Sequence, residues 1–182
     1  MTRCFGDGDP LYEAYHDTEW GLPVRGDAAL YERLCLEAFQ SGLAWITILR
    51  KRQAFRAAFA EFDPQAVAGF TDDDVARLLA DAAIVRNRAK ITATIANARA
   101  VLGLANTGRT LTDLVWSHAP AARPRPTTFA DVPTQTLESV ALARELKAAG
   151  FAFIGPTTAY ATMQACGLVD DHLAGCPAPR YG

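Results

Sequence analysis

Two pairs of potential metal ligands lie near opposite ends of the sequence. Cys4 and His16 occur close to the start, and His172 and Cys176 occur in "HLAGC", close to the end. Two thiolates and two imidazoles suit tetrahedral zinc, and four protein ligands leave no open position, which is typical of a structural site. The spacing alone also allows surface histidines and unused thiols that never meet. A shared site would tie the two ends of the chain together.

The other two cysteines have a different context. Cys35 in "LCLEAF" and Cys166 in "MQACGL" lie among apolar residues at helical spacing, which favours buried free thiols. The N-terminus lacks the plan of a signal peptide and no apolar stretch reaches the roughly 18 residues of a membrane span, so we expect a cytoplasmic protein without membrane contact. In that reducing compartment a disulfide between Cys4 and Cys176 is disfavoured.

A carboxylate stands inside an apolar stretch. Glu37 lies in "CLEAFQSGLAW", and because burying a carboxylate without a partner is costly, this position fits a binding site better than a core. A buried pair with an arginine, or a helix cap, is the alternative. Tyr12, Tyr15 and His16 share one face of a predicted helix, so a pocket and a metal site would be built on one surface. For the tyrosines alone, core packing is the alternative.

The elements that would position these residues are helices almost throughout. Helix-start signals occur at Asp9 before Pro10, at Asp27, at Asp63 before Pro64, and at Thr71 with Asp74. Gly42 and Gly150 are expected to end two of the helices. Neither an alternating strand pair nor an internal repeat is found, so the sequence predicts an all-α fold.

Composition and a proline-rich stretch bear on the domain organisation. The chain has 182 residues, half of them hydrophobic, and a net charge of -2, so it can bury a core but has no global field that attracts a polyanion. The basic runs over residues 50–56 and 85–90 are interpreted as solvated helix faces, with a local polyanion contact as the alternative. Residues 118–133 form a connector. The segment after it is too short for its own core, which predicts a single domain over residues 1–182.

A helical hairpin is predicted over residues 146–167, "LKAAGFAFIGPTTAYATMQACG". One helix stops at Gly150, and another starts with Gly155 and Pro156 at its mouth. This pattern resembles a helix-hairpin-helix element, in which backbone N–H groups at a helix N-terminus bind a DNA phosphate without reading sequence. Phe153 stands where the usual first glycine occurs, and an ordinary turn between two helices is the alternative.

Together these segments resemble one family, DNA-3-methyladenine glycosylase I, a bacterial base-excision repair enzyme. The resemblance runs from Arg3 to Cys176 and rests on Cys4, "DPLYEAYHDTEWG", "CLEAFQSGLAW", "GFAFIGPTTAY" and "MQACGLVDDHLAGC". It implies a helix-hairpin-helix DNA glycosylase fold. It also implies one structural Zn²⁺ per chain that joins the terminal segments, with the ligands Cys4, His16, His172 and Cys176.

The resemblance further implies a monomeric, monofunctional glycosylase that hydrolyses the N-glycosidic bond of 3-methyladenine in alkylated double-stranded DNA and releases the free base. The base would be extruded into a pocket, with Trp45 stacking on the cationic ring and Glu37 accepting from its amine edge. The implied base-binding residues are Tyr12, Tyr15, Trp20, Glu37 and Trp45. The implied DNA contacts are Leu43, as a wedge beside Gly42, and Gly155 and Thr157 at the hairpin.

Two departures from the family pattern change what can be carried over. Phe5 and a short "FGDG" loop stand where some members have a tryptophan, so one pocket wall is expected to differ. Asp170 in "VDDH" occupies the place of the catalytic carboxylate of related hairpin glycosylases, although this family is thought to manage without it. Asp170 is therefore a second candidate catalytic carboxylate beside Glu37, or else a hydrogen-bond partner of His172 or of a helix end. His118 has no evident partner and is expected at the surface or at a helix end.

Two alternative functions remain open at this point. The altered pocket wall would suit a related glycosylase with broader alkylbase specificity. A non-catalytic, zinc-stapled DNA-binding module would keep the hairpin and the metal ligands but release no base.

Overall fold

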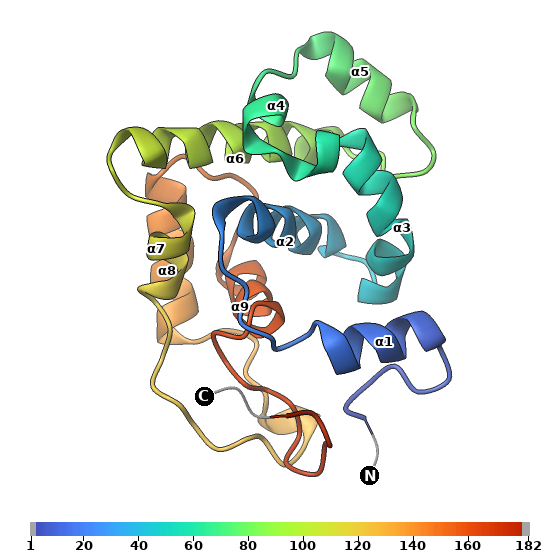
Figure 1. The fold of residues 1–182 in the computed structure, drawn as a ribbon, viewed down its shortest axis with the longest axis vertical. Coiled ribbons are helices and arrows are strands. Elements are labelled where there is room, and N and C mark those ends of the chain that lie inside the picture. Colours follow the sequence, from blue (N-terminus) through green and yellow to red (C-terminus); the bar gives the residue numbers. More distant parts are fainter. Residues whose placement is uncertain (1–2, 180–182) are drawn as a thin grey trace.

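The protein is described by a computed structural model over residues 3–179, which form nine α-helices and two short 3₁₀ helices and contain no strand (Figure 1). The helices are α1 (Pro10–Thr18), α2 (Asp27–Gln40), α3 (Trp45–Ala58), η1 (Ala60–Phe62), α4 (Pro64–Ala68), α5 (Asp72–Ala80), α6 (Arg88–Asn106), α7 (Leu111–Trp116), η2 (Phe129–Asp131), α8 (Leu137–Ala148) and α9 (Pro156–Ala165). The predicted all-α class is confirmed. Among the described residues, none of the helices has the length and hydropathy that crossing a bilayer requires.

Helix α2 lies at the centre of the molecule, and α3, α6, α7 and α9 all pack against it (Figure 1). Leu30, Tyr31, Leu34 and Phe39 of α2 have no exposed surface. A helix that packs against several neighbours buries a wide apolar face. The one polar group of this set, the Tyr31 hydroxyl, donates to the Thr94 carbonyl of α6 at 2.9 Å, so any functional group on α2 is held by packing from several directions.

The predicted helix starts are confirmed at Asp9, Asp63 and Thr71. The Asp9 carboxylate accepts from two backbone N–H groups in the first turn of α1, and Pro10 takes the first helical position. Asp63 caps α4 in the same way. Thr71 forms a capping box at the start of α5.

The predicted cap at Asp27 was wrong by one residue. Gly26 is the N-cap of α2, with a φ of 101° that favours glycine. The Asp27 carboxylate instead accepts from the N–H groups of Leu111 at 3.2 Å and Thr112 at 2.9 Å. It therefore stabilises the N-terminus of α7, a partner far away in the sequence.

The two ends of the described chain lie side by side with the connector (Figure 1). Apart from η2, residues 118–133 contain no helix. The connector runs along the C-terminal segment, where the Ala174 N–H donates to the Pro126 carbonyl at 2.8 Å. The segments that carry His172, Cys176, Cys4 and His16 are thereby brought to one end of the molecule.

Candidate functional site

The four predicted metal ligands form one buried cluster. The ligand atoms of Cys4, His16, His172 and Cys176 all lie within 4.8 Å of one another. Cys176 Sγ is 3.4 Å from His16 Nε2 and 3.6 Å from His172 Nδ1, and Cys4 Sγ is 3.6 Å from His172 Nδ1. The structure thus brings together two thiols and two imidazoles that could hold a metal ion.

The second ring nitrogen of each imidazole is held by a different partner. His16 Nδ1 lies 2.8 Å from Asp17 Oδ1, so its Nε2 faces the cluster. His172 Nε2 lies 3.2 Å from the Trp20 carbonyl, which leaves its Nδ1 for the cluster. Such outer contacts fix the orientation of metal-binding histidines.

A cavity of about 140 Å³ lies beside this cluster. Its lining residues come from the N-terminal segment and from α1, α2, α3 and α9, and they are Phe5, Tyr12, Tyr15, Trp20, Glu37, Gln40, Trp45, Ala161 and Gln164. All five residues predicted to bind a base are in this set. One cavity thus brings together all the residues for which the family resemblance implies contact with a base.

Aromatic rings form much of the cavity wall. The centroid of Phe5 lies 4.9 Å from that of Tyr12 and 5.0 Å from that of Trp20, and the Tyr15 and Trp45 centroids are 5.3 Å apart. These separations are typical of packed aromatic pairs. One wall of the cavity is therefore formed by the phenyl ring of Phe5, at the position where some family members have a tryptophan.

Glu37 is a buried carboxyl without a partner. Its exposed fraction is 6%, and it makes no hydrogen bond with the described residues. Arg33, the nearest cation on α2, pairs with Glu19 at 2.8 Å instead, so the alternative of a buried Glu37–arginine pair does not hold. Burial raises the pKa of Glu37 to about 8, against a weaker opposing effect of Arg33. Near neutral pH the free protein thus keeps this group largely protonated.

The indole of Trp45 adds a second unsatisfied group. Its Nε1 is buried and has no hydrogen-bond partner among the described residues. Buried polar groups in folded proteins are paired in the great majority of cases. Trp45 lines the cavity, but its Nε1 has almost no accessible surface, so the unpaired group in the cavity wall that a polar ligand could complete is the Glu37 carboxyl.

Comparisons with known proteins agree with this geometry. A sequence profile of the family described as methyladenine glycosylase matches residues 5–180. DNA-3-methyladenine glycosylase 1 of Escherichia coli K12 is 49% identical over 180 residues, which cover 97% of this chain and 96% of that protein. The Haemophilus influenzae DNA-3-methyladenine glycosylase is 44% identical over 180 residues, with 97% of each chain covered. The chain belongs to the methyladenine glycosylase family.

Solved structures of methyladenine glycosylases share its fold. The Staphylococcus aureus 3-methyladenine DNA glycosylase I, a structure described as showing the basis of 3-methyladenine recognition, matches with a TM-score of 0.93 at 35% identity. The match covers 98% of this chain and 97% of that chain. Another structure of 3-methyladenine DNA glycosylase I gives a TM-score of 0.94 at 46% identity, with 98% and 100% covered.

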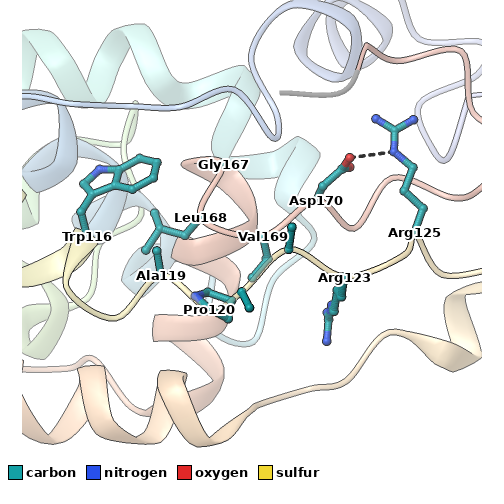
Figure 2. Close-up of a pocket in the computed structure, with 11 residues that line it drawn as sticks. Trp116, Ala119, Pro120, Arg123, Arg125, Gly167, Leu168, Val169 and Asp170 are labelled. Atoms are coloured by element: carbon teal, nitrogen blue, oxygen red, sulfur yellow. Dashed lines mark hydrogen bonds and ion pairs between the residues drawn. The ribbon is translucent and has the colours of Figure 1, made fainter. Parts of the chain in front are cut away.

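Asp170 lies outside the aromatic cavity of this methyladenine glycosylase. It lines a separate cavity of about 310 Å³ with Trp116 and residues 119–123, shown in Figure 2. Asp170 Oδ2 accepts from Arg125 Nε at 2.8 Å, and Asp170 Oδ1 accepts from the His172 N–H at 3.3 Å. Of the two sequence-based readings, the geometry supports the contact with His172.

Arg125 joins Asp170 to the rest of the C-terminal segment. Its side chain is only 4% exposed, and it also donates to the carbonyls of Cys176, Ala178 and Pro179 at 3.5, 2.9 and 2.8 Å. A single connector residue thus contacts the Asp170 side chain and the backbone at and after Cys176. Only the folded chain shows this, because Arg125 lies in a stretch without periodicity.

A turn over residues 149–155 joins α8 to α9. Gly150 and Phe153 both adopt positive φ, 97° and 63°, so Phe153 takes the left-handed backbone that glycine usually supplies in such a turn. Asn97 of α6 holds the turn by accepting from the Ala152 N–H at 2.7 Å and donating to the Ala152 carbonyl at 3.2 Å. Gly155 is the N-cap of α9.

The remaining predicted DNA contacts are accessible. Gly155 and Thr157 are exposed at the start of α9. Leu43 is 40% exposed in the turn between α2 and α3, next to Gly42, whose φ is 84°. An exposed leucine on a glycine turn has the character expected of a wedge.

The expectation that His118 has no partner was wrong. His118 Nε2 contacts the Glu145 carboxylate of α8, which also pairs with Arg109. The partner lies on another helix, so the sequence gave no local signal. Sequence reasoning also missed Gln164 as a cavity residue. Its only signal is the i, i+3 spacing with Ala161, which also lines the cavity.

Proposed function

We propose that this chain is a monofunctional DNA glycosylase that hydrolyses the N-glycosidic bond of 3-methyladenine in alkylated double-stranded DNA, in base excision repair. The observation that carries the proposal is Glu37, a buried and unpartnered carboxyl in an aromatic cavity. The 49% identity with the E. coli enzyme over nearly all of both chains gives the same function. One chain supplies all the cavity and cluster residues, and we propose that the protein acts as a monomer.

The cavity suits an extruded cationic base. Methylation at N3 leaves the adenine ring positively charged while it is attached to the sugar, and the electron-rich faces of Tyr15 and Trp45 attract a cation out of water. The same charge favours ionisation of Glu37, which then accepts a charge-assisted hydrogen bond from the amine edge. Neutral adenine brings no charge to offset the burial of a carboxylate. The pocket therefore selects by charge as well as by shape.

The chemical step needs less from the protein than the recognition step does. A cationic purine is a good leaving group, so strong acid assistance is not required, and water attacks the sugar carbon. Asp170, paired with Arg125 outside the cavity, is proposed to position the segment that carries His172. It is not proposed to touch the sugar.

The Cys4, His16, His172 and Cys176 cluster is proposed to hold one structural Zn²⁺. Zinc–sulfur bonds of about 2.3 Å and zinc–nitrogen bonds of about 2.0 Å at tetrahedral angles place sulfur and nitrogen about 3.5 Å apart. The sulfur–nitrogen separations of 3.4 and 3.6 Å fit this value. When bound, the ion would cross-link the two terminal segments and supply no Lewis acid to the reaction.

Leu43, Gly155 and Thr157 are proposed to contact DNA. The N-terminus of α9 presents backbone N–H groups to a phosphate, which gives binding that does not depend on sequence. Leu43 is proposed to fill the gap left by the extruded nucleotide. These contacts hold the duplex while the cavity receives the base.

The test is base release from methylated duplex DNA with identification of the products. Wild-type protein should release 3-methyladenine in excess over other alkylated bases, and free 3-methyladenine should compete. Glu37→Gln should slow release roughly ten- to a hundredfold, the effect of losing one charge-assisted hydrogen bond. Glu32→Gln, on the same helix but paired with Arg56 outside the cavity, is the matched control and should act like wild type. Duplex binding without release would instead establish a non-catalytic module, and equal release of several alkylated bases would establish the broader specificity.

A further inference from the structure

Gln164 shares the cavity with Glu37 but has no role in the recognition described so far. It comes from α9, and its side-chain amide carries a donor, Nε2, and an acceptor, Oε1, of nearly equal size. Which of the two is available to a ligand depends on what holds the amide. The contacts of Gln164 answer that question.

A buried network fixes the amide. Gln164 Nε2 donates to Asp171 Oδ2 at 2.9 Å. The Tyr160 hydroxyl donates to the same oxygen at 2.5 Å, and the Arg123 guanidinium donates to Asp171 Oδ1 at 2.7 Å. The Arg123 side chain is 38% exposed, but Asp171 and Tyr160 are each only 2% exposed, so the oxygen that holds Gln164 lies in buried surroundings. Hydrogen bonds in such surroundings are stronger and more directional than in water.

The Asp171 carboxylate allows only one orientation of the Gln164 amide. Asp171, paired with Arg123, offers only acceptors, so Gln164 must direct its NH₂ group at it. The carbonyl oxygen Oε1 is then turned away from Asp171, and it accepts no hydrogen bond from the described residues. Because Gln164 lines the cavity and its Nε2 is engaged, Oε1 is the polar atom that its side chain can offer to a ligand there, in addition to the Glu37 carboxyl.

We propose that Gln164 Oε1 is a second acceptor for the amine edge of the extruded base and that it makes the pocket select a 6-amino purine over a 6-oxo purine. An exocyclic amine carries two N–H hydrogens, and two acceptors satisfy both. A carbonyl at the same position can accept from Glu37 while that carboxyl is protonated, but it meets only an acceptor at Gln164, which leaves two oxygens facing each other without a donor in a buried site. The inference rests on the proposed glycosylase function and extends it to the choice between alkylated adenine and alkylated guanine.

The experiment compares three variants for binding of free 3-methyladenine and for single-turnover release of 3-methyladenine and 3-methylguanine from methylated duplex DNA. Gln164→Met keeps the length of the side chain and removes the acceptor. Asp171→Asn supplies a donor to Gln164 Oε1, so the amide can turn its own NH₂ toward the cavity. Tyr160→Phe removes one donor from Asp171 and leaves Gln164 in place.

Gln164→Met and Asp171→Asn should weaken 3-methyladenine binding about three- to tenfold, the effect of one neutral hydrogen bond. Both should also lower the ratio of 3-methyladenine to 3-methylguanine release. Tyr160→Phe should act in the same direction by a smaller factor. Gln53→Met, an exposed glutamine on α3, is the matched control and should leave affinity and ratio unchanged. Zinc content and melting temperature of Asp171→Asn are checked because this residue precedes His172.

Two results would overturn the inference. One is unchanged affinity in Gln164→Met. The other is a loss of equal size for both bases, which would mean that Gln164 only shapes the cavity. Failure of the proposed function is distinguishable, since wild-type protein would then release no 3-methyladenine at all.

Discussion

The Cys/His cluster and the aromatic cavity share helix α1 but differ in how their polar groups are paired. His16 faces the cluster, and Tyr15, its neighbour in sequence, faces the cavity. In the cluster both imidazoles are held through their second nitrogens, and the Leu173 N–H donates to Cys4 Sγ at 3.1 Å. In the cavity the Glu37 carboxyl has no partner among the described residues. The polar groups of the cluster are held by protein partners, whereas the cavity leaves a buried carboxyl for a ligand to satisfy.

This difference suggests a division of roles, in which the cluster contributes to stability and the cavity to ligand recognition. A satisfied, closed site contributes to folding, and an unsatisfied one lowers stability until its ligand arrives. The cluster anchors the segment that carries Phe5, Tyr12 and Tyr15. We therefore expect changes in the cluster to act on stability and changes in the cavity to act on recognition.

The largest expected effect is loss of a metal ligand. Purified protein should contain about one zinc per chain, and Cys4→Ser or His172→Ala should lower the melting temperature strongly, because the binding free energy of a closed site is folding free energy. Metal analysis and thermal unfolding check this, with Glu37→Gln as the control that keeps its zinc. If the protein without metal had the same melting temperature as the zinc-bound protein, the cluster would not contribute to stability, and the two regions would not differ in the way described.

The second effect is a pH dependence that originates in the cavity. The Glu37 pKa is about 8 in the folded protein, against an ordinary value of 4.5. The folded state therefore holds a proton that the unfolded state loses, so this stabilisation is present at low pH and is lost as pH rises toward and through 8. The change amounts to a few kcal/mol at about 1.4 kcal/mol per pKa unit.

Glu37→Gln should remove this dependence. Urea unfolding at about pH 5 and about pH 9 should show a smaller drop in unfolding free energy for the variant than for wild type. Glu32→Gln should retain the wild-type drop. Parallel curves for Glu37→Gln and wild type would mean that Glu37 is ionised and paired in the folded protein.

Sequence patterns predicted much of the fold and of the site because their signals are local. Asp9 and Asp63 cap helices that begin at the next residue. Asp27 was misassigned because its partners, Leu111 and Thr112, are on another helix. The position of Gln164 on α9 is readable from the sequence, but the orientation of its amide depends on a three-residue network.

The same reasoning applies to the metal ligands and to Asp170. The four ligands were predicted from residue type together with the family resemblance, since no spacing rule spans the distance from Cys4 to Cys176. The two readings of Asp170 could not be separated without Arg125, a connector residue that no periodicity marks. Long-range polar contacts are the part that sequence patterns did not supply.

A third, smaller effect concerns the support of the cluster. Arg125→Met should speed the release of zinc to a chelator and lower stability, because it leaves the carbonyls of Cys176 and Ala178 without their donor. Asp170→Asn keeps the acceptor for the His172 N–H and should change base release only a few-fold. Collapse of release in Asp170→Asn with intact 3-methyladenine binding would move the catalytic carboxylate from the cavity to Asp170.

The smallest effect is expected at the hairpin, which belongs to neither region. Gly155 has an ordinary φ of -86°, and a Cβ there would meet no atom within 4 Å, so the fold tolerates a side chain. Gly155→Leu should weaken duplex binding several-fold by keeping a phosphate away from the N-terminus of α9. Gly155→Ala should weaken duplex binding by a smaller factor. Affinity for free 3-methyladenine should not change in either variant, and an equal loss in both assays would make the hairpin a structural turn only.

The burial of all four cysteines protects the thiols of this protein from methylating agents. Methylating agents that modify adenine also react with thiolates, which are strong nucleophiles. Cys35 and Cys166 have no exposed surface, and burial raises the pKa of both to about 12, so they stay protonated. Cys4 and Cys176 are only 7% and 8% exposed. A protein that repairs alkylation damage thus presents almost no sulfur to the electrophile that causes it, and it can persist in the cell at the time when its substrate is formed.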